Sequence, residues 1–321
     1  MDNLSQHASQ ITFDVSKAFS DFIFKDDTDA TDELNSSENS LYANITQDLE
    51  GSSELANLVP VLPERLVAFL DEVGQENTDF DKICRIVESD ISLAGETIRI
   101  ANSPLYRRSL TPIETISKAI AMLGLDGVNR IATSLMMKQV LTIECDDLKQ
   151  IGEFLWSHCL ECAEASRYLN TDEDQFASYL LGLVHDVGAV AIFSCYANHH
   201  NDIEPGSANH SKVLKLIMEE QANWLSAHIA KEWNLPESVV SALYDFDSMK
   251  QMEMLDCDIS AKSDLALVLD KANTCSEVYT LVKEEVIEEE AGRSILLDSW
   301  LSDKEIDEVF AKFDVMHRAK V

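Results

Sequence analysis

A run of apolar residues from Phe176 to Phe193 is interrupted near its middle by a histidine and an aspartate, His185 and Asp186. The run is about long enough to span a bilayer, but an ionisable pair at that depth is costly, so a folded core explains it better. Neither side chain is cheap to bury without a polar partner. The run therefore predicts a buried helical core with a polar site inside it.

The rest of the chain also favours helices. Its 321 residues include only 10 Gly and 6 Pro, apolar residues recur at steps of three and four, and no alternating stretch of useful length is present. This pattern predicts an all-α fold. One helix is expected to end at Gly124, and the acidic run at 284–290 is expected to be a solvated face. Three helices are expected before the one that ends at Gly124, from Pro63 to Gly74, after Thr78 or Asp79, and from Ser92 to Asn102. Further helices are expected near 126–141, 150–169, 174–184, 188–196, 210–233, 236–246, 262–283 and 302–317.

The first 57 residues differ from the remainder and predict an acidic N-terminal extension ahead of a helical domain at 58–321. Residues 1–55 hold twelve acids and two bases, and the apolar residues from Leu4 to Phe22 fall on one stripe of an amphipathic helix. The following segment, Asp26 to Ser40, has almost nothing apolar and is interpreted as a flexible, solvated linker. Two interpretations of the helix stay open: it packs back onto the domain, or it docks onto a partner protein.

The charge balance limits the partners of the chain. Lys and Arg number 25 against 58 Asp and Glu, a formal net charge of −33. Such a surface repels phosphate backbones and anionic lipid, so direct nucleic-acid or membrane binding is not expected. Asp2 stands where the basic start of a secretory signal would lie, and the seven cysteines are scattered, so we expect a cytoplasmic location with reduced thiols.

Four side chains are candidate metal ligands: His158, His185, Asp186 and Asp270. Imidazole nitrogen and carboxylate oxygen both bind divalent first-row ions. His158 and Asp270 stand in apolar surroundings like the central pair, and a helix break permitted by Gly188 would let both central side chains face one ion. The alternative is a set of buried hydrogen-bonding groups that fix helix packing.

The ligand order and several flanking motifs resemble the HD superfamily of helical metal-dependent phosphohydrolases, and most closely its HDOD (HD-related output domain) family. The resemblance covers about 58–275 and implies an HD-like, multi-helix HDOD domain behind the acidic N-terminal extension. The motifs that carry it lie, in chain order, at 59–63 (VPVLP), 90–94 (DISLA), 100–106 (IANSPLY), 116–124 (ISKAIAMLG), 155–159 (LWSHC) and 233–236 (WNLP).

Three positions depart from the catalytic members of the superfamily. Ala189 stands where the two-metal phosphohydrolases have a phosphate-handling lysine, and Ala222 and the segment around Phe246 stand where they have further histidines. The second metal site and the phosphate grip that the resemblance would imply are thus missing. We therefore predict a degenerate metal site with no catalytic residue and no other cofactor-binding residue.

The resemblance implies a bacterial signal-transduction protein that acts as a non-catalytic output or interaction module and not as an enzyme. Its partners would then be other signalling proteins, and its cofactor, where one is bound, a divalent metal ion. The alternative is a single-metal HD-type phosphohydrolase acting on a nucleotide or cyclic nucleotide. The sequence leaves the oligomeric state undetermined.

Two further groups of metal-binding residue types have simpler interpretations. Cys159 and Cys162 lie mid-helix without a second cysteine pair at zinc-finger spacing, so buried thiols are expected. His199 and His200, with His210 nearby, are expected in a polar loop that follows a buried helix.

Overall fold

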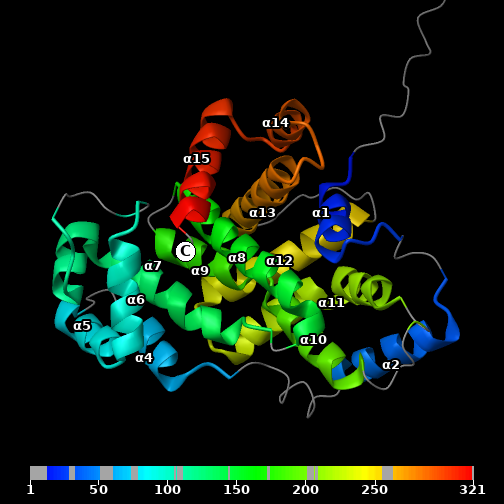
Figure 1. Ribbon diagram of the computed structural model, residues 1–321, viewed down its shortest axis with the longest axis horizontal. Coiled ribbons are helices and arrows are strands. Elements are labelled where there is room, and N and C mark those ends of the chain that lie inside the picture. The colour runs from blue at the N-terminus through cyan, green and yellow to red at the C-terminus, as the bar shows by residue number, and fades with distance from the viewer. Residues whose placement is uncertain are drawn as a thin grey trace, which may run out of the picture.

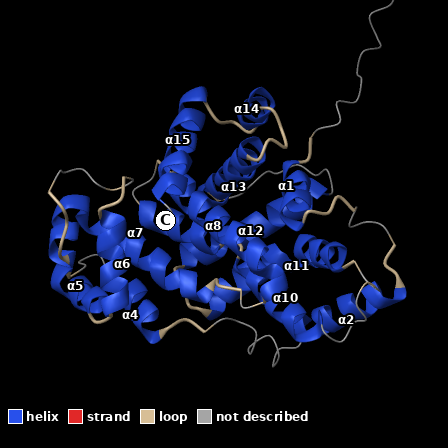
Figure 2. Cartoon of the chain, in the orientation of Figure 1, coloured by secondary structure: helices blue, strands red, loops and turns tan. Residues whose placement is uncertain are grey.

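The computed structural model describes residues 13–28, 33–50, 61–73, 79–104, 106, 111–143, 145–171, 174–200, 206, 209–254 and 263–319. Within these ranges all regular structure is helical and no strand occurs (Figure 2), which confirms the predicted all-α fold. The helices are α1 (Val15–Phe24), α2 (Ser36–Glu50), α4 (Glu64–Val73), α5 (Phe80–Glu88), α6 (Ile91–Ala101), α7 (Ile116–Val140), the 3₁₀ helix η1 (Asp146–Leu148), α8 (Lys149–Leu169), α9 (Gln175–Val184), α10 (Val187–His199), α11 (His210–Glu232), α12 (Glu237–Met254), α13 (Asp264–Lys283), α14 (Glu289–Asp298) and α15 (Asp303–Ala319).

The helices form a small lobe beside a larger body (Figure 1). Helices α4, α5 and α6 pack against α7 in the lobe, and α7 continues into the body, where it contacts α9. Helices α8 to α13 make up the body, α14 and α15 lie over one end, and α1 and α2 lie on the side away from the lobe. The chain thus brings its N-terminal helices back onto the body.

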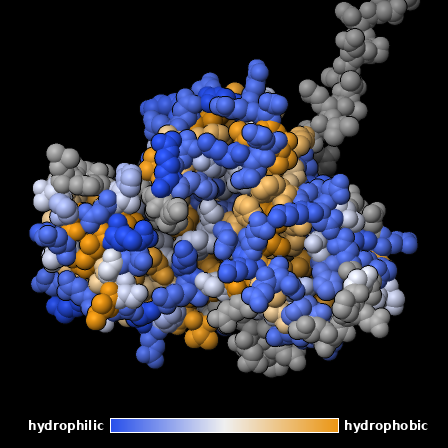
Figure 3. All heavy atoms as spheres, in the orientation of Figure 1, coloured by the Kyte–Doolittle hydropathy of each residue, from blue (hydrophilic) through white to orange (hydrophobic). Residues whose placement is uncertain are grey.

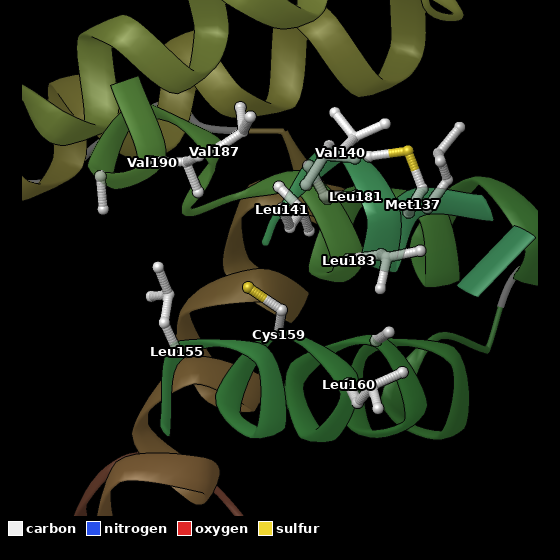
Figure 4. Close-up of a cluster of buried hydrophobic side chains, with 14 of the residues drawn as sticks. Met137, Val140, Leu141, Leu155, Cys159, Leu160, Leu181, Leu183, Val187 and Val190 are labelled. Atoms are coloured by element: carbon white, nitrogen blue, oxygen red, sulfur yellow. The ribbon is translucent and has the colours of Figure 1, made fainter. Parts of the chain in front are cut away.

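The apolar run of the sequence forms the centre of the body. It is two helices, α9 and α10, that are separated by a turn at His185 and Asp186. Figure 4 shows the surrounding core, in which Leu155, Cys159 and Leu160 of α8 lie opposite Leu183 of α9 and Val187 and Val190 of α10. By length and composition 175–199 is the one described stretch long and apolar enough to cross a membrane, yet 89% of the 18-residue apolar window within it is buried inside the protein, as expected for core helices.

Two glycines set how closely these helices approach their neighbours. A Cβ built on Gly182 would lie 2.5 Å from the carbonyl oxygen of Cys162, so α9 rests directly on α8. A Cβ on Gly188 would lie 2.1 Å from the carbonyl oxygen of Ala222, so α10 rests directly on α11. Gly188 therefore serves close packing within a regular helix and not the break that the sequence led us to expect.

The predicted helix boundaries agree with the structure at most places. The expected end at Gly124 is a break inside α7, where Gly124 has φ 77° and non-helical geometry. Helix α14 was not predicted, because its first turn lies in the acidic run that was interpreted as a solvated face. Acidic side chains suit the positive end of a helix dipole, and Leu296 anchors α14 to the core.

Helix α2 corrects the predicted linker. Residues 36–40, expected to be flexible, form the first turns of α2, which buries Leu41, Ile45 and Leu49. Asn35 Oδ1 accepts hydrogen bonds from the first turn, and Glu38 Oε2 accepts one from the Asn35 backbone N–H at 2.9 Å. This reciprocal cap was a sequence signal for a helix start that the acidic composition concealed.

The amphipathic helix predicted near the N-terminus is present in part. Residues 15–24 form α1, and residues 4–12 of the predicted stripe lie outside the described residues. Helix α1 packs against α8 and α13, with Phe19, Ile23 and Phe24 buried, and Asp21 accepts a hydrogen bond from Lys215 Nζ at 2.5 Å. Residues 15–24 therefore pack back onto the body, which is the first of the two interpretations left open by the sequence. The domain division at 57/58 stays a prediction.

Candidate metal centre

Four polar side chains from three places in the body meet between α8, α13 and the α9–α10 turn. Helix α8 supplies His158, the turn supplies His185 and Asp186, and α13 supplies Asn273. Asp186 occupies the position before α10, but its side chain makes no capping hydrogen bond. Its carboxylate faces the two histidines instead.

The interatomic distances show that four atoms converge on one point. The Nε2 atoms of His158 and His185 are 3.3 Å apart. Asn273 Oδ1 lies 3.0 Å from the first and 3.2 Å from the second. Asp186 Oδ2 lies 3.5 Å from each. Two imidazole nitrogens, one carboxylate oxygen and one amide oxygen therefore share a single centre.

The outer hydrogen bonds determine which ring nitrogens carry protons. His185 Nδ1 lies 2.8 Å from the carbonyl oxygen of Gly182, which can only accept, so Nδ1 is the donor. The Ser276 hydroxyl donates to the carboxylate of Glu161 at 2.5 Å, so it accepts from His158 Nδ1 at 2.8 Å. In the neutral state of both rings the inward Nε2 atoms bear lone pairs.

Asn273 is oriented in the same sense. Its side chain hydrogen-bonds to the buried carboxyl group of Glu277, and the ionised form of Glu277 accepts from the amide N–H₂, which leaves Oδ1 facing inward. Glu277 also accepts a hydrogen bond from Ser16 of α1 at 3.0 Å. Burial raises the pKa of Glu277 to about 7 and lowers the pKa of His158 below its usual value. The His158 ring is therefore neutral near pH 7.

The arrangement fits a divalent cation. Four acceptors face one another, and the outer Nδ1 atoms are held by a carbonyl and a hydroxyl, as in histidines that ligate metals. A mixed nitrogen and oxygen set suits Mn²⁺, Fe²⁺ or Co²⁺, with Asp186 as the one carboxylate. His158, His185, Asp186 and Asn273 are thus the residues that would hold an ion.

The structure does not place Asp270, the fourth predicted ligand, in the group around His158. Its carboxylate accepts a hydrogen bond from Lys250 Nζ at 2.6 Å, and among the described residues it is in no group of converging ligands. Asn273, three residues later on α13, supplies the fourth oxygen. As a carboxylate in an apolar stretch, Asp270 is the more obvious ligand in the sequence, although Asn273 interrupts the apolar residues of the same helix in the same way.

The three departures from the catalytic pattern are all part of the core. Ala189, Ala222 and Phe246 are buried and belong to the hydrophobic cluster of the body. None of these side chains can bind a metal or a phosphate, and each packs in the apolar core instead.

Cys159 and Cys162 are free, buried thiols, as predicted. Burial raises the pKa of each well above its usual value, so both stay protonated. Cys162 Sγ lies 3.7 Å from His158 Nε2 and 3.8 Å from the carbonyl oxygen of Ala272. Both sulfurs line the centre: the Cys162 sulfur lies within 4.8 Å of ring nitrogens of His158 and His185, and the Cys159 sulfur within 4.8 Å of ligand atoms of His185 and Asp186.

An all-helical body that brings a His and a His–Asp pair around one point agrees with the resemblance to the HD superfamily. The family model of the HDOD domain matches residues 59–247, more than half of the chain, and the protein belongs to the HDOD domain family. No curated protein sequence matches the chain.

Solved structures show the same fold. A protein of Shewanella amazonensis provisionally named a metal-dependent phosphohydrolase is 18% identical, with a TM-score of 0.60 over 87% of this chain and 100% of that one. An HDOD domain protein of unknown function from Geobacter sulfurreducens is 19% identical, with a TM-score of 0.56 over 86% and 95%. A protein of Marinobacter aquaeolei provisionally named a signal transduction protein is 17% identical, with a TM-score of 0.57 over 91% and 68%.

Proposed function

We propose that this HDOD protein is a non-catalytic output module of bacterial signal transduction, whose partners are other signalling proteins. We propose further that its centre holds a divalent ion in a structural role, joining α8, the α9–α10 turn and α13. The observation that carries the proposal is the cover of the centre by the N-terminal helix of the same chain.

Helix α1 touches the centre at two points. The ring of Phe19 lies against the His158 imidazole, with centroids 5.0 Å apart, and Phe19 is only 8% exposed. Ser16 donates a hydrogen bond to Glu277, the partner of Asn273. A hydrolase needs open space beside its ion for a substrate, and here an apolar side chain takes space next to a ligand.

The described cations near the family motifs are already paired. Arg130 is buried with Glu164, and Lys118 donates to Glu114 at 2.7 Å on the surface. Arg107 and Arg108, the other bases near family-typical positions, lie outside the described residues. Phosphoryl transfer needs cations that stabilise developing negative charge, and paired cations serve this role poorly.

The surface agrees with a protein that meets other proteins. Figure 3 shows a mostly hydrophilic face with apolar side chains both on the α4–α6 lobe and around α13 and α1. On this lobe Val61 and Ile91 are 87% and 90% exposed. The net charge of −33 opposes binding to polyanions.

The convergence of four acceptors favours one second candidate, a single-metal phosphohydrolase acting on a nucleotide or cyclic nucleotide. A bound ion would supply Lewis-acid chemistry at the centre. In this candidate α1 must move away from His158 before a substrate enters.

A turnover assay separates the two candidates. The full chain, loaded with Mn²⁺, Mg²⁺, Co²⁺ or Zn²⁺, is tested on p-nitrophenyl phosphate, nucleoside triphosphates and cyclic dinucleotides, with Asp186→Asn as the matched control. We expect no difference in product between wild type and Asp186→Asn. Turnover that the wild type shows and Asp186→Asn lacks would establish the hydrolase and overturn the proposal.

A further inference from the structure

A second group of metal-binding side chains lies where the loop before α8 meets the end of α10. Cys145 precedes η1, Asp147 lies within it, and His200 follows α10. The Cys145 sulfur, a carboxylate oxygen of Asp147 and a ring nitrogen of His200 all lie within 4.8 Å of one another. The group shares no residue with the centre around His158.

The neighbouring histidines of the sequence motif have other roles. His199 Nε2 lies 2.7 Å from Asp48 of α2, and His210 Nδ1 lies 2.8 Å from the hydroxyl of Tyr196. The motif expected to be a polar loop therefore divides into two histidines that hold helices and one, His200, that faces a thiol and a carboxylate.

The His200 ring is held in the orientation that a ligand needs. Its Nδ1 lies 3.0 Å from the carbonyl oxygen of Ala197, which makes Nδ1 the donor. The ring stacks on Tyr196 with centroids 5.2 Å apart and an interplanar angle of 22°. Nε2 therefore bears the lone pair, and it faces Asp147 Oδ2 at 4.0 Å. A backbone carbonyl that fixes the far nitrogen is the usual support of a metal-ligating histidine.

The other two ligands lie at different depths. Cys145 is a free thiol that is only 7% exposed, and its side chain makes no capping hydrogen bond to η1. The Asp147 side chain is 67% exposed. An ion can therefore reach the group from solvent on the Asp147 side and meet the thiol beneath it.

We propose that Cys145, Asp147 and His200 bind one zinc ion. Sulfur, imidazole nitrogen and carboxylate oxygen are the ligands that Zn²⁺ takes, whereas Mg²⁺ and Ca²⁺ take oxygen alone. Binding displaces the thiol proton to solvent, and the thiolate with Asp147 then balances the charge of the ion. Solvent completes the fourth position. The bound ion ties the loop before α8 to the end of α10.

Cobalt(II) is the probe, because a Co²⁺–thiolate bond absorbs in the near ultraviolet and reports a cysteine ligand directly. The full chain is expected to show this band and to lose it when excess Zn²⁺ is added. Cys145→Ser and His200→Gln are expected to abolish the band. Cys84→Ser is the matched control, since Cys84 is equally 7% exposed but lies on α5, and it should retain the band.

Two more variants make the outcome decisive. Asp147→Asn alters an exposed side chain, so it should keep the helical circular dichroism of the wild type. It should lower the affinity for Zn²⁺ by at least about tenfold, measured by competition with a chromogenic chelator. Loss of a residue that only hydrogen-bonds to a metal ligand already lowers metal affinity by about that much. His185→Gln should retain the Co²⁺ band. A band that survives Cys145→Ser, that disappears in His185→Gln, or an Asp147→Asn affinity equal to wild type would overturn the proposal.

Discussion

The substitution Asn273→Asp tests the centre around His158 most directly. Asn273 Oδ1 and Asp186 Oδ2 lie 3.0 and 3.5 Å from the same His158 Nε2, so they can be no more than about 6.5 Å apart. Two carboxylates at that separation repel by at least about 2.5 kcal/mol at an effective dielectric constant of about 20. Without an ion, the variant should therefore have an unfolding free energy lower than wild type by about that amount or more.

A divalent ion should reverse this loss. An ion at 100 times its dissociation constant stabilises the folded state by about 2.7 kcal/mol, and the added charge should tighten binding to the variant. Urea unfolding of both proteins in chelator and in Mn²⁺ measures the difference. We expect the unfolding free energy of Asn273→Asp to be lower than that of wild type in chelator and equal to it in Mn²⁺.

Asp270→Asn is the control on the same helix. Its ion pair with Lys250 is about a quarter exposed, so its loss should cost at most about 1 kcal/mol and should leave the response to Mn²⁺ unchanged. If the difference in unfolding free energy between wild type and Asn273→Asp is the same in chelator and in Mn²⁺, no ion binds at this centre. Loss of the Mn²⁺ response in Asp270→Asn would restore Asp270 as the ligand.

Three other predictions concern the packing and charge around the centre. Phe19→Ala should lower the unfolding free energy by about 3–5 kcal/mol in urea titration, because Phe19 is core, whereas a detachable N-terminal helix would leave it unchanged. Gly188→Ala should lower the free energy of unfolding by about 1–3 kcal/mol or more, since the added Cβ would strike the backbone of α11. Gly95→Ala, whose Cβ would meet nothing within 4 Å, should leave the free energy of unfolding unchanged or raise it by up to about 1 kcal/mol. Equal effects of the two substitutions would contradict the close approach of α10 and α11. Burial acts to raise the pKa of Glu164, but the charges of Arg130, Arg167 and Lys312 and the hydrogen bond from Arg167 together outweigh burial and lower the pKa. The ionised Glu164 therefore stabilises the fold above the unfolded pKa of about 4.3, and its contribution is lost as pH falls through the lower folded pKa. The stability gap between wild type and Glu164→Gln, about 3–5 kcal/mol at pH 7, should therefore narrow in acid, and a constant gap between pH 7 and pH 3 would show that the charge of Glu164 does not matter.

Most of the fold followed from local patterns. Apolar spacing placed most body helices to within a few residues, although α12 runs eight residues beyond its predicted end at 246. The His185–Asp186 pair inside an apolar run located the polar site. These signals are local because a helix hides one face, and the residues on that face recur with the helical period. The helices that were missed, α2 and α14, have acidic composition, and only their few buried residues, such as Leu41 and Leu296, mark them.

The tertiary structure alone decided which residues meet. Asp270 and Asn273 lie on one helix, separated axially by about 4.5 Å, and the period of the sequence cannot tell which of them reaches His158. That choice depends on how far α13 is shifted along α8, which the packing of the whole body sets. The position of α1 is a second such choice, because an amphipathic stripe requires an apolar contact but does not say with what. The sequence therefore determined that α1 must bury Phe19, and only the packed body decided that Phe19 lies on His158.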